Sequence, residues 1–164
     1  MKDAHARGVT LLELLVGLAI LAVVGSLALP SMHGPLARER LSHAAQALAG
    51  DLADARFEAA RRAAPLHIEV TPGTQWCWSV AAVPGCGCSA PQPCQIKTVR
   101  ALDHPGVRLV SGRGARVDAH GVADGPLAAT FESAANESLR VDLLALGRAR
   151  VCSLRGPSRR HPAC

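Results

Sequence analysis

The feature that most constrains this chain is an almost unbroken apolar run near its amino terminus. Residues 9–29 carry a single charged side chain, that of Glu13. As an α-helix rising about 1.5 Å per residue, this run would be roughly 31 Å long, close to the thickness of a bilayer's hydrocarbon core. Lys2 and Arg7 precede it and outnumber Asp3, which favours a cytoplasmic amino terminus. We therefore expect one transmembrane helix, with the rest of the chain in the periplasm or outside the cell.

A cleaved secretory signal peptide is the alternative interpretation of this run. A basic start, an apolar stretch and the small residues Ser26 and Ala28 fit the general pattern of such peptides. Glu13 argues against it, because a carboxylate within an apolar helix costs about 2.5 to 3.5 kcal/mol on insertion scales. Such a group usually persists only where it has a partner or a role, and a disposable signal gives it neither.

The beginning of the run resembles the class III signal of type IV pilins and type II secretion pseudopilins. Residues 8–16 read GVTLLELLV, and apolar residues and Pro30 follow. The resemblance implies that a prepilin peptidase cuts after Gly8 and methylates the new amine of Val9, which stands where phenylalanine is usual. Glu13 then becomes the fifth residue of the mature chain and pairs with the amino-terminal amine of a neighbouring subunit. An ammonium and a carboxylate buried together in lipid stabilise each other, whereas either alone is poorly tolerated.

The next segment predicts an amphipathic helix. Pro30 and Pro35 should kink or interrupt the helical run, because each removes a backbone donor and crowds the preceding turn. Beyond Leu36, apolar residues recur at spacings of four and three until the helix ends before Pro65. The stripe consists of Leu41, Ala45, Leu48, Leu52, Ala55 and Ala59. We interpret it as the face that packs on the chain's own sheet, and a helix that binds a separate partner is the alternative.

The remainder of the chain alternates with the period of β-strands, separated by glycine, proline, asparagine and aspartate. The predicted strands are 66–70, 76–80, 96–100, 107–111, 128–131, 138–143 and 148–153. A long helix followed by strands predicts an α+β fold, with the helix lying on an antiparallel sheet. Because aromatic residues are scarce, we expect a core built mostly of alanine, valine and leucine. The expected organisation is a leader (1–8), a membrane and filament-core helix (9–29), an amphipathic helix (30–64), a β-rich head (65–153) and a basic tail (154–164).

Two further stretches resemble GspH/FimT-type minor pilins and pseudopilins. Residues 55–59 read ARFEA, as in the alanine-arginine-x-glutamate-alanine stretch of that family, and residues 147–150 read GRAR, as in the glycine-arginine-x-arginine signature of its terminal hairpin. The resemblance implies a pilin-like head and a subunit at the tip of a filament. Its implied partners are other major and minor pilins or pseudopilins, the prepilin peptidase, the inner-membrane assembly platform and membrane lipid.

Six cysteines follow the apolar run: Cys77, Cys86, Cys88, Cys94, Cys152 and Cys164. An even number in an oxidising compartment predicts disulfides, and six cysteines allow 15 connectivities. A Cys152–Cys164 bond would tie the tail back, but the sequence does not choose among the pairings. A zinc site, with help from His104 and His120, is the less favoured alternative because no C-x₂-C pair recurs at the spacing of a zinc finger. We expect both histidines to be exposed and no metal or cofactor to be bound.

The positive charge is concentrated at the carboxyl end. All 13 acidic residues lie at or before Asp142, whereas five of the 18 basic residues follow it: Arg148, Arg150, Arg155, Arg159 and Arg160. Arginine grips phosphates bidentately, and FimT-type pilins are implicated in DNA uptake, so the resemblance implies a DNA contact here. No aromatic residues interleave with the arginines to stack bases, so such binding would be driven by phosphates and independent of sequence. A solubilising or filament-docking tail is the alternative.

No known catalytic motif occurs in the chain. The sequence has no nucleophile elbow, zinc-protease helix, Walker loop or dinucleotide fingerprint, and residues 111–114 read as a turn without the residues of a phosphate loop. We therefore expect a structural protein and not an enzyme. The sequence favours a minor pilin or pseudopilin of a type IV pilus or a type II secretion system, anchored in the inner membrane with a periplasmic head. A DNA-binding minor pilin that captures DNA for natural transformation is the alternative.

Overall fold

The computed structural model describes residues 10–28, 33–144, 147–158 and 160–164. It comprises two compact units, Met1–Leu36 and Ala37–Cys164. Helix α1 (Leu11–Ala28) lies in the first unit, and α2 (His33–Arg62) begins at the end of that unit and continues through the second. Pro30 lies outside the described residues. Pro35 is the third residue of α2, in the first turn, where no intrahelical hydrogen bond needs its missing N–H, so it does not break this helix.

One face of α2 forms a wall of the core of the second unit. All six residues of the predicted stripe, together with Ala44, are at most 2% exposed: Leu41, Ala45, Leu48, Leu52, Ala55 and Ala59. The predicted amphipathic helix is therefore confirmed, and its apolar face packs on the chain's own strands. The helix ends where Ala63 takes a positive φ of 50° and Ala64 donates its N–H to the Ala59 carbonyl, just before Pro65.

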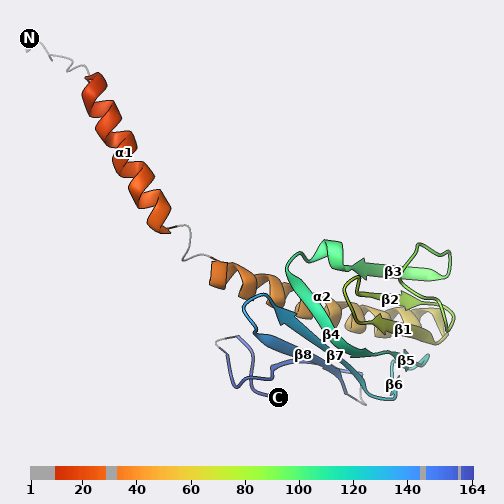
Figure 1. The fold of residues 1–164 in the computed structure, drawn as a ribbon. Helices are drawn as coiled ribbons and strands as arrows, with labels where there is room; N and C mark the ends of the chain where they lie inside the picture. Colours follow the sequence, from red (N-terminus) through yellow and green to blue (C-terminus); the bar gives the residue numbers. More distant parts are fainter. Residues whose placement is uncertain (1–9, 29–32, 145–146, 159) are drawn as a thin grey trace, which may run out of the picture. The chain divides into compact units, whose positions relative to one another are not determined.

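The strands form two antiparallel sheets against α2 (Figure 1). The five-stranded sheet has the order β3-β2-β1-β5-β6 and the four-stranded sheet the order β4-β7-β8-β9. The strands are β1 (Leu66–Thr71), β2 (Cys77–Ala81), β3 (Gln95–Arg100), β4 (Val107–Arg113), β5 (Ala115–Val117), β6 (Ala123–Asp124), β7 (Leu127–Ser133), β8 (Ser138–Leu143) and β9 (Ala149–Ser153). Every predicted strand is present, and the α+β expectation is confirmed. The two short strands β5 and β6 were not predicted, because neither is long enough to show a period.

The chain passes from one sheet to the other at two glycines that lie against β1. A Cβ on Gly112 would lie 2.3 Å from Val70 Cγ1, and a Cβ on Gly114 would lie 2.3 Å from the Ile68 carbonyl oxygen. At Gly114 only glycine permits so close an approach to the β1 backbone, whereas at Gly112 a Cβ would collide with the Val70 side chain. The turn expected at residues 111–114 is therefore wrong: this stretch is the end of β4 and the passage into β5.

Three of the four aromatic residues meet in the core. The rings of Trp76 and Trp78 are stacked 5.5 Å apart, and the Phe131 ring meets both edge-on at 5.8 Å. Phe57 is the exception, because its side chain lies on the outer side of α2 and is 78% exposed. The core is thus small aliphatic side chains around one aromatic cluster, which compensates for the scarcity of aromatic residues.

A buried carboxylate joins α2 to the five-stranded sheet. Asp51, which is 3% exposed, accepts a hydrogen bond from the Trp78 indole N–H at 2.8 Å and pairs with the Lys97 ammonium. Trp78 belongs to β2 and Lys97 to β3. Asp51 therefore fixes the helix against two neighbouring strands and satisfies a donor that would otherwise be buried without a partner.

Candidate assembly and nucleic-acid interfaces

The predicted assembly residue Glu13 lies in the first turn of α1. Its backbone N–H donates to the Thr10 hydroxyl at 3.3 Å, and the Leu14 N–H donates to the Thr10 carbonyl. Thr10 therefore caps the helix, with Glu13 as the third helical residue, where a carboxylate also faces the positive end of the helix dipole. Sequence reasoning did not single out Thr10, although the T-x-x-E spacing of residues 10–13 is the pattern of a capping box. Gly8 and Val9, the predicted cleavage and methylation residues, lie outside the described residues.

The sides of α1 present an uncovered apolar surface in the chain taken alone. Ten of its leucine, isoleucine and valine side chains are more than half exposed: Leu11, Leu12, Leu14, Leu15, Val16, Leu18, Ile20, Leu21, Val23 and Val24. A soluble monomer rarely leaves so continuous an apolar surface in water. In the part of the chain that the structure describes, no helix combines the length and the hydropathy of a membrane span.

The terminal hairpin of β8 and β9 places Arg150 beside acidic Asp142. Arg150 pairs with Asp142 at 3.3 Å, and Arg140 donates to the same carboxylate at 2.6 Å, so this acid is shared by two guanidinium groups. Arg148 is exposed, and no carboxylate among the described residues pairs with it. The two signature arginines are therefore in different electrostatic states, which their spacing in sequence did not reveal.

The described part of the C-terminal segment, residues 154–158 and 160–164, is joined to β9 and α2. The Cys152–Cys164 disulfide closes it, and Ser153 exchanges backbone hydrogen bonds with it, donating to the Pro162 carbonyl at 2.8 Å and accepting from the Cys164 N–H at 3.1 Å. Arg160 pairs with Glu39 on α2. Arg155 is exposed and has no carboxylate partner among the described residues, whereas Arg159 lies outside them.

His161 anchors this segment to the helix. Its side chain is buried, and its Nε2 lies 3.0 Å from the Ser42 hydroxyl on α2. Burial, reinforced by the neighbouring Arg160 guanidinium, holds the pKa of His161 below its ordinary value. His161, which the sequence did not mark as a candidate, thus anchors the basic tail. Among the four described arginines that follow Asp142, only Arg148 and Arg155 have no carboxylate partner.

Two segments that resemble the GspH/FimT motifs touch each other. Arg56, from the ARFEA stretch on α2, donates its Nε–H to the Gly121 carbonyl at 3.0 Å. Gly147, the first residue of the GRAR stretch, packs against the same group, since a Cβ there would lie 2.4 Å from Arg56 Nε and 2.4 Å from the Gly121 oxygen. The fold therefore brings the ARFEA stretch of α2 and the GRAR stretch of the terminal hairpin into contact at Arg56 and Gly147.

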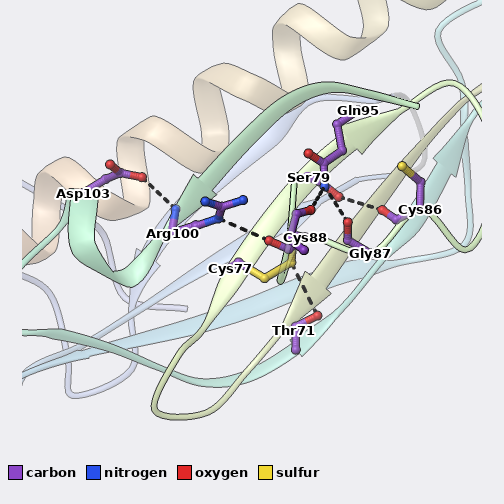
Figure 2. The surroundings of a disulfide bond; sticks show 10 residues. Thr71, Cys77, Ser79, Cys86, Gly87, Cys88, Gln95, Arg100 and Asp103 are labelled. Carbon is purple, nitrogen blue, oxygen red and sulfur yellow. Dashed lines mark hydrogen bonds between the residues drawn. A yellow bond between two sulfur atoms is a disulfide. The ribbon is translucent and has the colours of Figure 1, made fainter. Parts of the chain in front are cut away.

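The six cysteines form three disulfides: Cys77–Cys88, Cys86–Cys94 and Cys152–Cys164. Figure 2 shows the first of these, with the Arg100 Nε–H donating to the Cys88 carbonyl at 3.4 Å and the Gln95 side chain donating to the Gly87 carbonyl at 2.6 Å. The two overlapping disulfides thus close the segment between β2 and β3 and tie it to β2 through Cys77, whereas the Gln95 and Arg100 side chains bind it to β3. Such cross-links constrain the unfolded chain and so stabilise the folded one.

The histidines considered for a metal site lie apart. His104 is half-buried near Trp76 and Trp78, with ring centroids about 6 Å away, and burial lowers its pKa. The expectation that it is exposed is therefore wrong, because the aromatic cluster extends to it. His120 is exposed beside Asp118. Among the described residues, no three cysteine, histidine or acidic side chains are grouped as a metal site would require.

Comparisons with known proteins agree with this architecture. Residues 3–29 match the prokaryotic N-terminal methylation motif. Two crystal structures of the type IV minor pilin FimU from Pseudomonas aeruginosa are similar to the chain at 16% identity. One has a TM-score of 0.53 and covers 70% of this chain and 89% of FimU; the other has a TM-score of 0.51, covering 68% and 91%. No curated protein sequence matches the chain.

The chain therefore has a pilin-like α+β fold preceded by a prokaryotic N-terminal methylation motif. The methylation motif agrees with the resemblance of residues 8–16 to the signal of pilins and pseudopilins. The GspH/FimT resemblance is more specific than these findings and is compatible with them.

Proposed function

We propose that the protein is a minor pilin, a subunit that assembles with other pilins into a type IV pilus. The observation that carries the proposal is the joint presence of the methylation motif at residues 3–29 and a head with the fold of the minor pilin FimU. The exposed apolar sides of α1 support it, because a filament core or a membrane would cover them.

In this proposal the prepilin peptidase cleaves after Gly8 and methylates Val9, and α1 joins the filament core. Glu13 supplies the carboxylate that pairs with the ammonium of a neighbouring subunit. Its place in the first turn, beside the Thr10 cap, keeps it near the amino end of the mature helix. Water cannot readily solvate a charge inside an apolar filament core. Removal of either charge of the pair therefore leaves the other charge buried without a partner.

The proposed location is the inner membrane, with the head in the periplasm and the subunit drawn into the filament tip by the assembly platform. Three disulfides agree with an oxidising compartment. The pseudopilus of a type II secretion system is the alternative machine. Deletion of the coding sequence distinguishes the two, because a pilus subunit is needed for surface pili and a pseudopilus subunit for protein secretion.

Substitutions at Glu13 and Thr10 test the role of the glutamate charge. Glu13→Gln keeps the size of the side chain and the backbone hydrogen bond to the Thr10 hydroxyl, but it removes the charge. Thr10→Val removes the cap and keeps the charge. We expect Glu13→Gln to be absent from sheared filaments on immunoblots, whereas Thr10→Val is retained; normal incorporation of Glu13→Gln would refute the pairing.

A second candidate function is capture of DNA, and it is favoured by the electrostatic state of Arg148. Arg148 and Arg155 are exposed without carboxylate partners among the described residues, so their guanidinium groups can contact phosphates without first breaking an ion pair. Arg150 and Arg160 are already paired with Asp142 and Glu39. The structure thus divides the arginines into two sets with different expected contributions.

A DNA titration at several salt concentrations tests this candidate. Arg148→Ala and Arg155→Ala should each weaken binding and reduce the log–log salt slope by about 0.9 for each phosphate that is no longer neutralised. Arg160→Ala is the matched control, since its charge is paired with Glu39 in the free protein. Absence of binding at low salt would leave the pilus subunit as the function.

A further inference from the structure

Three segments that are distant in sequence meet at the guanidinium group of Arg56. Arg56 lies on α2, Gly121 in the turn between β5 and β6, and Gly147 in the turn between β8 and β9. The Arg56 Nε–H donates to the Gly121 carbonyl at 3.0 Å, and Gly147 is buried against both groups. We call Arg56, Gly121 and Gly147 the arginine clamp. It joins the helix to one turn from each of the two sheets.

The acceptor of the clamp is held in place by its own turn. The Asp118 carboxylate accepts the backbone N–H groups of Val122 at 2.8 Å and His120 at 2.9 Å, and the Gly121 N–H donates to the Asp118 carbonyl at 3.0 Å. These backbone donors keep the pKa of Asp118 below its ordinary value, and the Val122 N–H has the largest effect. The carboxylate therefore stays ionised at neutral pH. The position of the Gly121 carbonyl is thus fixed independently of Arg56.

Gly147, the second glycine of the arginine clamp, is connected to exposed Arg148 by the chain and by backbone hydrogen bonds. Gly147 takes a positive φ of 72° and donates its N–H to the Leu144 carbonyl at 2.7 Å, while the Leu144 N–H donates to the Arg148 carbonyl at 2.9 Å. A Cβ on Gly147 would collide with the Arg56 side chain and the Gly121 oxygen. The close packing therefore fixes Gly147, and with it the backbone of the next residue, Arg148.

We propose that Arg56 is a positioning residue: its side chain holds Gly147 so that the next residue, Arg148, is presented to a polyanion. The inference rests on the DNA-binding candidate above and adds to it a residue outside the hairpin. Among the described residues, Arg56 has no carboxylate partner and makes one side-chain hydrogen bond, to the Gly121 carbonyl. Its assigned role is to fix backbone geometry, with the phosphate contacts left to the hairpin.

The test compares Arg56→Gln with Arg61→Gln in the full-length chain, kept in solution by a non-ionic detergent. Both changes remove one positive charge from α2, but the Arg61 side chain is exposed and pairs with Glu58, so it serves as the charge-matched control. The probes are a short fluorescein-labelled duplex DNA, titrated at several salt concentrations, and hydrogen exchange at the Gly147 and Leu144 amides. Urea unfolding of each variant reports global stability.

For Arg56→Gln we expect faster exchange at both amides and a Kd raised about tenfold, near the effect of losing one charged hydrogen bond, with the salt slope unchanged. Arg61→Gln should match the wild type. Arg56→Lys, which can still donate to Gly121, should recover part of the affinity and serves if Arg56→Gln does not fold. Unchanged exchange would overturn the proposal, and so would a salt slope reduced by about 0.9, which would make Arg56 itself a phosphate ligand.

The two hypotheses fail in different ways. If the wild-type chain does not bind the duplex at low salt, the DNA-binding candidate fails, and with it the presentation of Arg148 to DNA. The exchange measurement then still decides whether Arg56 holds the turn. If the wild type binds DNA and Arg56→Gln binds equally well at equal stability, the DNA-binding candidate stands and the positioning role is refuted.

Discussion

The buried Asp51 offers a quantitative test of how the head is held together. Its carboxylate accepts the Trp78 indole N–H at 2.8 Å and pairs with Lys97. In Asp51→Ala the indole N–H, in a side chain with no exposure, loses its acceptor, which costs about 1 to 3 kcal/mol. Lys97 is half exposed and can turn to water, so the broken ion pair adds at most about 1 kcal/mol. We expect a total loss of about 1 to 4 kcal/mol in the free energy of unfolding.

Asp51→Asn separates the two contributions, because its amide oxygen still accepts the indole N–H while the charge is gone. This variant should lose about 1 kcal/mol or less. Asp54→Ala is the control, since Asp54 lies on the exposed face of the same helix and its removal should change stability by about 0.5 kcal/mol or less. Urea unfolding followed by tryptophan fluorescence reports the head directly, because Trp76 and Trp78 are the only tryptophans and both are buried. Equal stabilities for Asp51→Ala and Asp54→Ala would refute the reasoning.

Three further changes test the hairpin and the C-terminal segment. Burial lowers the pKa of His161, so the unfolded chain binds a proton at this residue more readily than the folded chain does. The stability that this histidine contributes above about pH 6.5 should therefore be lost as the pH falls. His161→Gln should show a flatter dependence of the urea midpoint on pH. Gly147→Ala should destabilise the head more than Gly156→Ala, because both glycines have positive φ but only Gly147 has no room for a Cβ, and thermal unfolding compares them. Replacing the Cys152–Cys164 bond by two serines should cost up to about 3 kcal/mol and open the tail to trypsin, as gel electrophoresis after brief digestion would show.

The sequence predicted the fold well wherever a periodic pattern was long enough to read. The stripe of α2 repeats over 19 residues, from Leu41 to Ala59, and all of its members are buried. β5 and β6 have three and two residues, too few to alternate visibly. The division into two sheets could not be read either, because it depends on the close packing of Gly112 and Gly114 against β1, and these glycines resemble an ordinary turn in sequence.

The candidate interfaces were predicted in part, because sequence gives charges but not their partners. Composition located the arginines of the carboxyl end, yet it could not show that Glu39, more than 100 residues earlier, neutralises Arg160. The partner of Arg150 lies on the adjacent strand, and that of Arg56 is a backbone carbonyl with no signal in sequence. The Thr10 cap could have been predicted, since its spacing to Glu13 is local.

The passage of the chain between the sheets at Gly112–Gly114 bears on how the head responds to force. Because β4 and β5 are nearly one continuous strand that lies across β1, tension on either sheet is transmitted to the other through covalent bonds and not only through side-chain packing. Sliding of one sheet past the other would strain the Gly114 connection, where a Cβ would lie 2.3 Å from the Ile68 carbonyl oxygen. Under load, the hydrogen bonds of β4 to β7 and of β5 to β1 should therefore share the force between the two sheets.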